Sequence, residues 1–256
     1  MPTPAFADLL TLIEDRSAAL RGAASDAGPD ARVPGCPDWS VRDLVTHLGG
    51  VQLFWAAAVT AGQADGPPGE EQVGDREPGA DLMGWSAAAT GRLTAALREA
   101  GPDRPCWTWW PESGAPMTSG AIARHQVQEA GVHAFDAQEA AGRAEPLPAV
   151  VAADGIGEFL TVGLASMGPW PHRPGAVGLA AADGTAWQVS LTPDGARATE
   201  AGEPGAGTAA AEPDAWLRGT ASDLVLALYG RHTDRGVAAE GDRELAEAML
   251  GWPEND

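Results

Sequence analysis

Hydrophobic residues recur at helical spacing in four long stretches of the first half of the chain. These stretches cover residues 4–23, 38–61, 81–100 and 122–141, and each places apolar side chains three and four positions apart. Turns rich in glycine, proline and aspartate separate them. Four amphipathic helices of about twenty residues predict a four-helix bundle.

After residue 146 the pattern changes to one helix and several short alternating runs. A helix is predicted over 150–166, and apolar runs at 176–181 and 186–191 flank Asp183-Gly184 as in a β-hairpin. Further strands are predicted at 196–200, 208–211 and 237–240, and helices at 214–229 and 242–250. We therefore predict an α+β fold with a helical domain at 1–145 and a smaller domain at 146–256.

Composition restricts the partners and the compartment. The net charge is -20 and all sixteen basic residues are arginine, which argues against nucleic acid or an anionic membrane as a partner. Residues 1–10 lack a basic segment and a long apolar run, so we expect no secretory signal. We also expect that no segment is long enough to cross a bilayer, and a cytoplasmic protein is the default expectation. Cys36 and Cys106 do not form a disulfide framework, and neither has an adjacent base in the sequence.

A carboxylate and an imidazole lie on the apolar side of the fourth predicted helix. Glu129 and His133 are four residues apart and project from one face, so both can reach a single metal ion. A charged group on a buried face needs an ionic partner or a metal. His47, on the second predicted helix, is the candidate third ligand. His125 competes by spacing, and a histidine in an apolar helix is more often an ordinary hydrogen-bonded residue. The opposite arc, expected to face solvent, carries Arg124, Gln128 and Gln138.

Three segments carry a family resemblance. They are residues 33–49 (VPGCPDWSVRDLVTHLG), 129–137 (EAGVHAFDA) and 219–231 (GTASDLVLALYGR), the last continued by 237–242. Together they resemble the mycothiol-dependent maleylpyruvate isomerase family in the same order along the chain. Tyr229 stands where that family commonly has tryptophan, and Gln128 and Ala134 stand where it often has histidine and arginine, which leaves the substrate open.

The resemblance implies a fold, a metal site and a cosubstrate. The fold would be a DinB-like four-helix bundle followed by a smaller α/β domain related to sterol-carrier-protein folds. The metal, usually zinc, would be held by His47, Glu129 and His133, with one coordination position open as in catalytic sites. Asp136 could orient an imidazole, and Arg231 is a candidate contact for an anionic cosubstrate.

The expected activity is attack by a thiol on an electrophilic small molecule. A divalent cation stabilises the thiolate of mycothiol, which then reacts by S-transfer, the reaction we favour, or by cis-trans isomerisation. Trp107, Trp109 and Trp110 could line an apolar acceptor pocket, although simple packing also explains them. Two alternatives stay open: a metal-dependent hydrolase that uses metal-bound water, and a non-catalytic DinB-like binding module.

Overall fold

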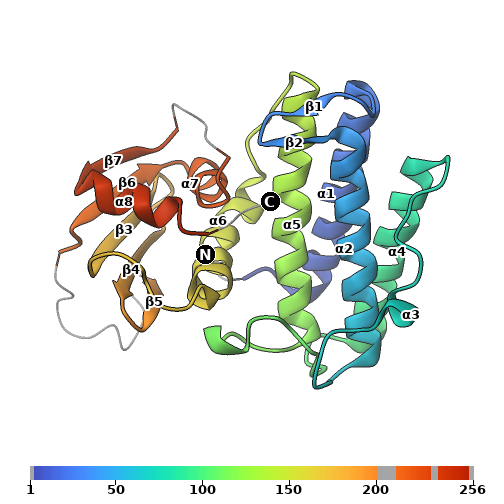
Figure 1. Cartoon of the computed structure of the whole chain (residues 1–256), viewed down its shortest axis with the longest axis horizontal. Helices are drawn as coiled ribbons and strands as arrows, with labels where there is room; N and C mark the ends of the chain where they lie inside the picture. The colour runs from blue at the N-terminus through green and yellow to red at the C-terminus, as the bar shows by residue number, and fades with distance from the viewer. Residues whose placement is uncertain (1–2, 201–211, 232–235, 254–256) are drawn as a thin grey trace. The chain divides into compact units, whose positions relative to one another are not determined.

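The computed structural model describes the chain except for residues 1–2, 201–211, 232–235 and 254–256. The chain forms two compact units (Figure 1). The first comprises residues 4–109 and 116–147, and the second comprises residue 3, residues 110–115 and the described part of 148–256. The α+β fold class predicted from the sequence is confirmed.

Four long helices form the first unit. They are α1 (Phe6–Ala27), α2 (Val41–Ala61), α4 (Leu82–Ala100) and α5 (Ser119–Ala140). In Figure 1 they run alongside one another, α1 packing against α5 and α2 against α4. All four correspond to the predicted helices. The apolar side chains that recur at helical spacing in each of them are buried in the core of the bundle.

Side-chain caps fix where three of these helices begin. Ser40, Asp81 and Thr118 accept hydrogen bonds from backbone N–H groups in the first turns of α2, α4 and α5. Such caps satisfy donors that the first helical turn leaves unpaired. The residue directly before each of these helices therefore determines where the helix begins.

Small elements that the sequence analysis did not predict lie between the long helices. Strands β1 (Arg32–Val33) and β2 (Cys36–Ser40) pair antiparallel and lead into α2. A one-turn helix, α3 (Glu70–Val73), interrupts the loop between α2 and α4. Both are too short to show a hydrophobic period.

A close contact joins α2 to α4. A Cβ placed on Gly49 would lie 2.2 Å from the indole ring of Trp85. Glycine at this position therefore lets the tryptophan of α4 pack directly on the backbone of α2. This packing involves the side of α2 that faces α4, which leaves His47 to project from another side.

The second unit combines a five-stranded sheet with three helices. Helix α6 (Ala149–Glu158) continues through a π-helical turn at Phe159–Gly163 and a 3-10 turn at Leu164–Ser166. The strand order is β5 (Gly195–Glu200), β4 (Ala186–Thr192), β3 (Gly175–Ala181), β6 (Ala215–Gly219) and β7 (Ala238–Gly241). Only the β3–β6 pair is parallel among these neighbours. Helices α7 (Ala221–Leu228) and α8 (Arg243–Leu250) follow β6 and β7.

One predicted helix of this unit is partly wrong. The stretch 214–229 was expected to be a single helix, but its first part is strand β6 and only α7 is helical. Ala215 and Leu217 are buried while Trp216 and Arg218 lie on the other face, which is the two-residue period of a strand. Pairing with β3 and β7 fixes that strand. The predicted strand at 208–211 lies outside the described residues.

The expectation that no segment is long enough to cross a bilayer also needs correction. Two helical segments, Val41–Ala61 and Ala149–Ser166, are long and apolar enough by length and composition. Their most apolar windows are 61% and 67% buried within the protein. Core helices pass the same test, so this result is weak evidence for a membrane span.

Candidate metal centre

Two helices of the bundle bring together the three predicted ligands. His47 projects from α2, and Glu129 and His133 project from α5. One potential ligand atom of each lies within 4.8 Å of those of the other two. His133 is buried, whereas His47 and Glu129 are partly exposed with side-chain exposures of 25% and 17%. The cluster is thus open to solvent on one side only.

The two distances that involve Glu129 match what a small divalent ion requires. Oε1 of Glu129 lies 3.0 Å from Nε2 of His47 and 3.4 Å from Nε2 of His133. Ligands about 2.0–2.1 Å from a tetrahedral zinc ion lie about 3.3 Å from one another. Two imidazoles and a carboxylate are also a donor set that zinc prefers, so these residues could hold a metal.

Asp136 orients one of the two imidazoles. Nδ1 of His133 lies 2.9 Å from Oδ2 of Asp136, which is completely buried. Because a carboxylate only accepts, Nδ1 carries the proton and Nε2 points toward Glu129. The orienting role expected for Asp136 is supported by this geometry. It is the arrangement that fixes the tautomer of metal-binding histidines.

The electrostatics of the cluster favour charged groups. Burial tends to lower the pKa of His133, but hydrogen bonds to Asp136 and Glu129 and their negative charges outweigh it and raise the pKa to about 9. Burial tends to raise the pKa of Glu129, but the two histidines outweigh it and hold this pKa well below its ordinary value. The carboxylate is therefore ionised at neutral pH, as a metal ligand must be, whereas His133 must lose its Nε2 proton when a metal binds and then keeps the Nδ1 proton that it shares with Asp136.

Trp39 forms a wall beside the cluster that the sequence analysis did not assign to the site. Its ring centroid lies 4.7 Å from that of His47 and 6.0 Å from that of His133. The indole is held there because Trp39 lies in β2 directly before Ser40. Ser40 is both the last residue of β2 and the N-cap of α2, which begins at Val41. Its place in the DWS segment directly before the helix was the available signal.

The remaining candidates of the bundle separate from the cluster. His125 does not join the three ligands; its ring lies 6.0 Å from that of Trp55 and 5.7 Å from that of Trp109. Gln128 is fully buried, so its predicted exposure is wrong. Nearly every residue of the middle of α5 is buried, and an amphipathic wheel cannot assign an outer face to such a helix.

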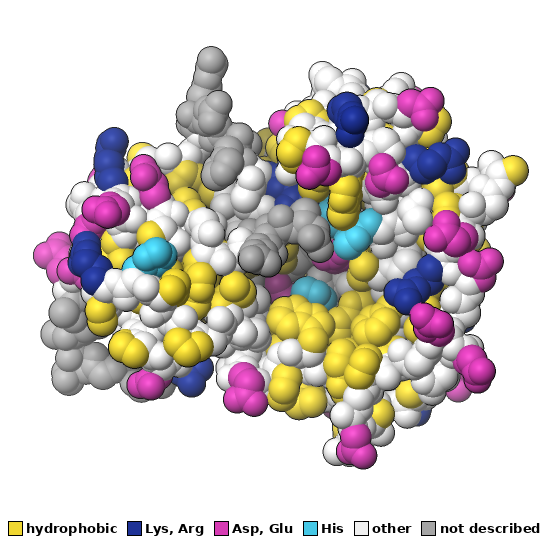
Figure 2. All heavy atoms as spheres, viewed as in Figure 1, with side chains coloured by type: hydrophobic (Ala, Val, Ile, Leu, Met, Phe, Trp, Pro, Cys, Tyr) yellow, Lys and Arg dark blue, Asp and Glu magenta, His cyan; other side chains and the backbone are white. Residues whose placement is uncertain are grey.

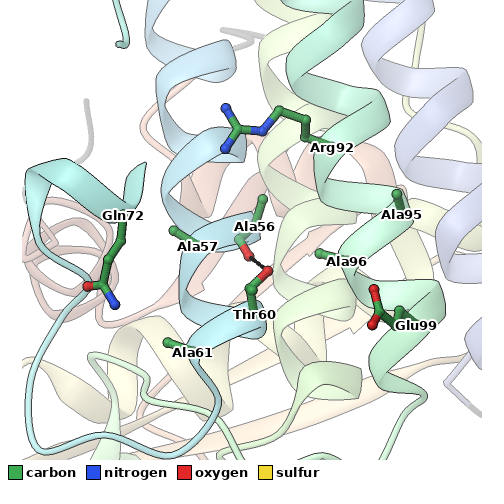
Figure 3. A pocket seen from close by; sticks show the side chains of 9 residues that line it. All are labelled: Ala56, Ala57, Thr60, Ala61, Gln72, Arg92, Ala95, Ala96 and Glu99. Atoms are coloured by element: carbon green, nitrogen blue, oxygen red, sulfur yellow. Dashed lines mark hydrogen bonds between the residues drawn. The ribbon is translucent and has the colours of Figure 1, made fainter. Parts of the chain in front are cut away.

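A groove elsewhere on the bundle has no comparable chemistry. It has a volume of about 490 Å³ and lies between α2 and α4, with Gln72 of α3 also in its lining (Figure 3). Thr60 in its wall donates a hydrogen bond to the carbonyl of Ala56. Alanines make up most of the lining, and no histidine or cysteine is among the lining residues. The cluster at His47 is therefore the stronger candidate site.

Comparison with known families identifies the chain. Residues 10–138 match the profile of the mycothiol maleylpyruvate isomerase N-terminal domain, and residues 150–248 match that of the MDMPI C-terminal domain. The chain belongs to the mycothiol maleylpyruvate isomerase family. The resemblance found in the sequence is thereby confirmed. A search of curated proteins gave no match.

Solved structures share the fold of this family member. The crystal structure of a mycothiol-dependent maleylpyruvate isomerase has 15% sequence identity and a TM-score of 0.61, and a histidine-to-alanine mutant of that enzyme has 16% identity and a TM-score of 0.64. In both comparisons the match covers 94% of this chain and 96% of the other. At these identities the similarity establishes the fold.

Arg231, the predicted cosubstrate contact, belongs to the other compact unit of this family member. It follows Gly230, whose φ of 73° lies in the left-handed region, and it is buried. Its Nη1 donates a hydrogen bond to the carbonyl of Tyr229 over 2.7 Å, and its backbone N–H donates to the carbonyl of Leu226. The guanidinium is thus fixed by the end of α7.

Proposed function

We propose that this protein is a divalent-metal-dependent enzyme that activates the thiol of mycothiol for attack on an electrophilic small molecule. The observation that carries the proposal is the convergence of His47, Glu129 and His133, whose histidine nitrogens lie 3.0 and 3.4 Å from one carboxylate oxygen of Glu129. Membership of the mycothiol maleylpyruvate isomerase family supports mycothiol as the thiol. Zinc is the metal that best suits two imidazoles and a carboxylate.

The bound metal and the residues assigned to the site would have different roles in the reaction. A bound divalent cation would supply charge that favours the thiolate form of the cosubstrate near neutral pH. Asp136 holds the His133 ring in place, and Trp39 shields one side of the cluster from water. Arg231 remains our candidate for binding an anionic group of a cosubstrate, because its guanidinium carries a permanent positive charge.

The reaction would begin with a new carbon–sulfur bond. The thiolate sulfur adds to one carbon of a double bond conjugated to a carbonyl, and the electron pair of that bond moves onto the carbonyl oxygen. In cis-trans isomerisation the resulting single bond rotates, the double bond re-forms and the thiolate leaves. In S-transfer the adduct takes up a proton, or a leaving group departs, and the thioether remains. The family supports isomerisation, and transfer uses the same first step.

Metal analysis together with a thiol-dependent assay tests this function. We expect about one zinc ion per chain in the wild type, as for a site with three protein ligands, and loss of zinc in His47→Ala and Glu129→Ala. The exposed Glu145→Gln variant serves as the control that keeps the metal. Isomerisation of maleylpyruvate or consumption of an alkylating electrophile should require mycothiol and fail in both alanine variants.

Three results would contradict the proposal. Equal metal content in the wild type and in both alanine variants would show that these residues do not hold the metal. Turnover of an ester or amide without any thiol would instead support a metal-dependent hydrolase. Metal binding without any activity would support a binding module.

A further inference from the structure

Five aromatic rings form a shelf on the same side of the bundle as the metal-binding cluster. We define the aromatic shelf as Phe54, Trp55, Trp107, Trp109 and His125, all within the first compact unit. The rings of Trp55 and Trp107 stack with centroids 6.2 Å apart, and Phe54 meets Trp107 edge-on at 5.9 Å. His125 joins Trp55 to Trp109 through edge-on contacts.

The shelf continues the cluster along both helices. Phe54 follows His47 by seven residues on α2, a rise of about 10.5 Å, and the partly exposed Val51 lies between them. His125 precedes Glu129 by four residues on α5, a rise of about 6 Å. The two helices therefore carry matching stripes of partly exposed side chains that lead from the metal ligands to the shelf.

One end of the shelf lies open. Trp109 is 42% exposed, and Met117 nearby in the sequence is 39% exposed; both are among the most exposed large hydrophobic residues of the described chain. Figure 2 shows hydrophobic side chains gathered beside histidine side chains on one face of the bundle. Trp109 is the exposed ring of the shelf, Phe54, Trp107 and His125 are partly exposed, and Trp55 is buried beneath them. A large exposed indole supported by further aromatic rings indicates a binding surface.

Two of the three tryptophans in residues 107–110 belong to the aromatic shelf. Trp110, which the sequence placed with Trp107 and Trp109, is fully buried and groups with the second compact unit. Trp55 and His125 take its place, because the helices α2 and α5 bring them beneath the segment. The shelf is thus assembled from three separate parts of the chain.

From this arrangement we infer that the electrophilic acceptor carries a planar aromatic ring, which stacks on Trp109 and Trp107 while its reactive carbon lies at the metal-binding cluster. Flat rings stack offset or edge-on with centroids 4.5–7 Å apart, which is the spacing already present within the shelf. The shelf begins about 6 Å along α5 from Glu129 and about 10.5 Å along α2 from His47, so an acceptor that contacts both must extend away from its reacting double bond, as the ring of an aryl ketone does. The inference rests on the proposed function, since it names the acceptor of that reaction.

A matched pair of substrates tests the inference. The two are cis-4-oxo-4-phenylbut-2-enoate and cis-4-oxopent-2-enoate, which differ only in a phenyl or methyl group beyond the carbonyl. With the zinc-loaded wild type and mycothiol, we expect kcat/KM for isomerisation to be about tenfold higher for the phenyl compound. Trp109→Ala and Trp109→Leu should bring this ratio close to one, mainly through KM of the phenyl compound.

A tryptophan outside the shelf provides the control. Trp216 lies on β6 under the guanidinium of Arg218, whose Cζ is 4.7 Å from the ring centroid. Trp216→Ala removes a partly exposed indole and should leave the phenyl-to-methyl ratio as in the wild type. Equal kcat/KM for both compounds in the wild type, or an unchanged ratio in both Trp109 variants, would overturn the inference.

A binding measurement separates failure of the inference from failure of the proposed function. Isothermal titration of the zinc-loaded protein with unreactive 4-oxo-4-phenylbutanoate should give binding that Trp109→Leu weakens about fivefold or more. If neither cis compound is isomerised, the proposed function fails. This titration alone then shows whether the aromatic shelf binds an aryl group. No binding by the wild type, or equal binding by the variant, would overturn the inference whether or not the isomerase reaction occurs.

Discussion

The imidazole of His133 donates its Nδ1 proton to Asp136 over 2.9 Å, and both side chains are buried on α5. This contact leaves Nε2 of His133 as the atom that faces Glu129. One residue of the helix thus fixes the tautomer of another, three positions earlier.

Removing the charge of Asp136 should weaken metal binding. Asp136→Asn keeps the size of the side chain but lowers the basicity of the His133 ring, and we expect zinc affinity to fall about 10–100-fold. Competition with a chromophoric chelator at neutral pH measures this affinity. Glu139→Gln, one turn further along α5, is the control. Unchanged affinity in both Asp136→Asn and Asp136→Ala would refute the orienting role.

A buried network of hydrogen-bonded side chains inside the bundle should contribute to the free energy of unfolding. Nε2 of Gln52 donates to Ser17 Oγ, and its Oε1 accepts from the Thr90 hydroxyl, each over 2.8 Å. Arg21 donates a hydrogen bond to the Thr90 hydroxyl over 3.1 Å, at the partly exposed end of this hydrogen-bond network. The network connects α1, α2 and α4.

Gln52→Ala should lower the free energy of unfolding by about 2–4 kcal/mol. The substitution leaves the buried hydroxyls of Ser17 and Thr90 short of a partner and opens a cavity. Urea denaturation should show a lower midpoint with an unchanged m value. The exposed Gln63→Ala serves as the control. A loss below about 0.5 kcal/mol would mean that other groups replace the amide.

The long helices and the metal ligands were predictable for different reasons. Helices α1, α2, α4 and α5 show their period over about twenty residues each, and local caps mark their starts. Glu129 and His133 could be paired by helical spacing. His47 lies 82 positions before Glu129, and its contact depends on the packing of α2 against α5. Spacing within one helix cannot supply that information, so His47 was a candidate by its place on another apolar helix and the resemblance then favoured it.

Other features were set by packing between distant segments. Strand β6 contains only five residues, and its alternation becomes decisive through pairing with β3. Gln128 is buried because α5 is covered on nearly all sides in its middle. The aromatic shelf combines parts of α2 and α5 with Trp107 and Trp109, so only its Trp107–Trp109 part was visible in the sequence.

Neither cysteine should react quickly in the folded protein. Cys36 and Cys106 are buried with 5% and 2% exposure, and burial raises the pKa of the Cys106 thiol. A thiol with a raised pKa holds little thiolate at neutral pH. Ellman's reagent should therefore label less than one thiol per native chain over minutes and two in guanidinium chloride. Fast labelling of the native chain, lost in Cys106→Ser, would show that this thiol is accessible and activated.

Acid should weaken the junction that holds Trp39 beside His47. Ser40 Oγ accepts from the backbone N–H of Asp43, and the Asp43 carboxylate accepts from the backbone N–H of Ser40 at 2.8 Å. The hydrogen bonds from Ser40 lower the pKa of Asp43. Because the folded pKa lies below the unfolded one, the contribution to stability is present above about pH 3.9 and is lost as the pH falls through the folded value.

Ser40→Ala should therefore destabilise the protein by about 1 kcal/mol at pH 7. In a double-mutant cycle with Asp43→Asn, the coupling between the two residues should disappear once Asp43 is protonated. Asp8→Asn provides the matched control, since Asp8 lies in the first turn of α1, which has no side-chain cap. Loss of the cap should also reduce quenching of Trp39 by the adjacent imidazole, which the fluorescence difference between each variant and its Trp39→Phe counterpart isolates. A coupling that persists at a pH where NMR shows Asp43 to be protonated would show that the carboxylate is not the group that fixes this end of α2.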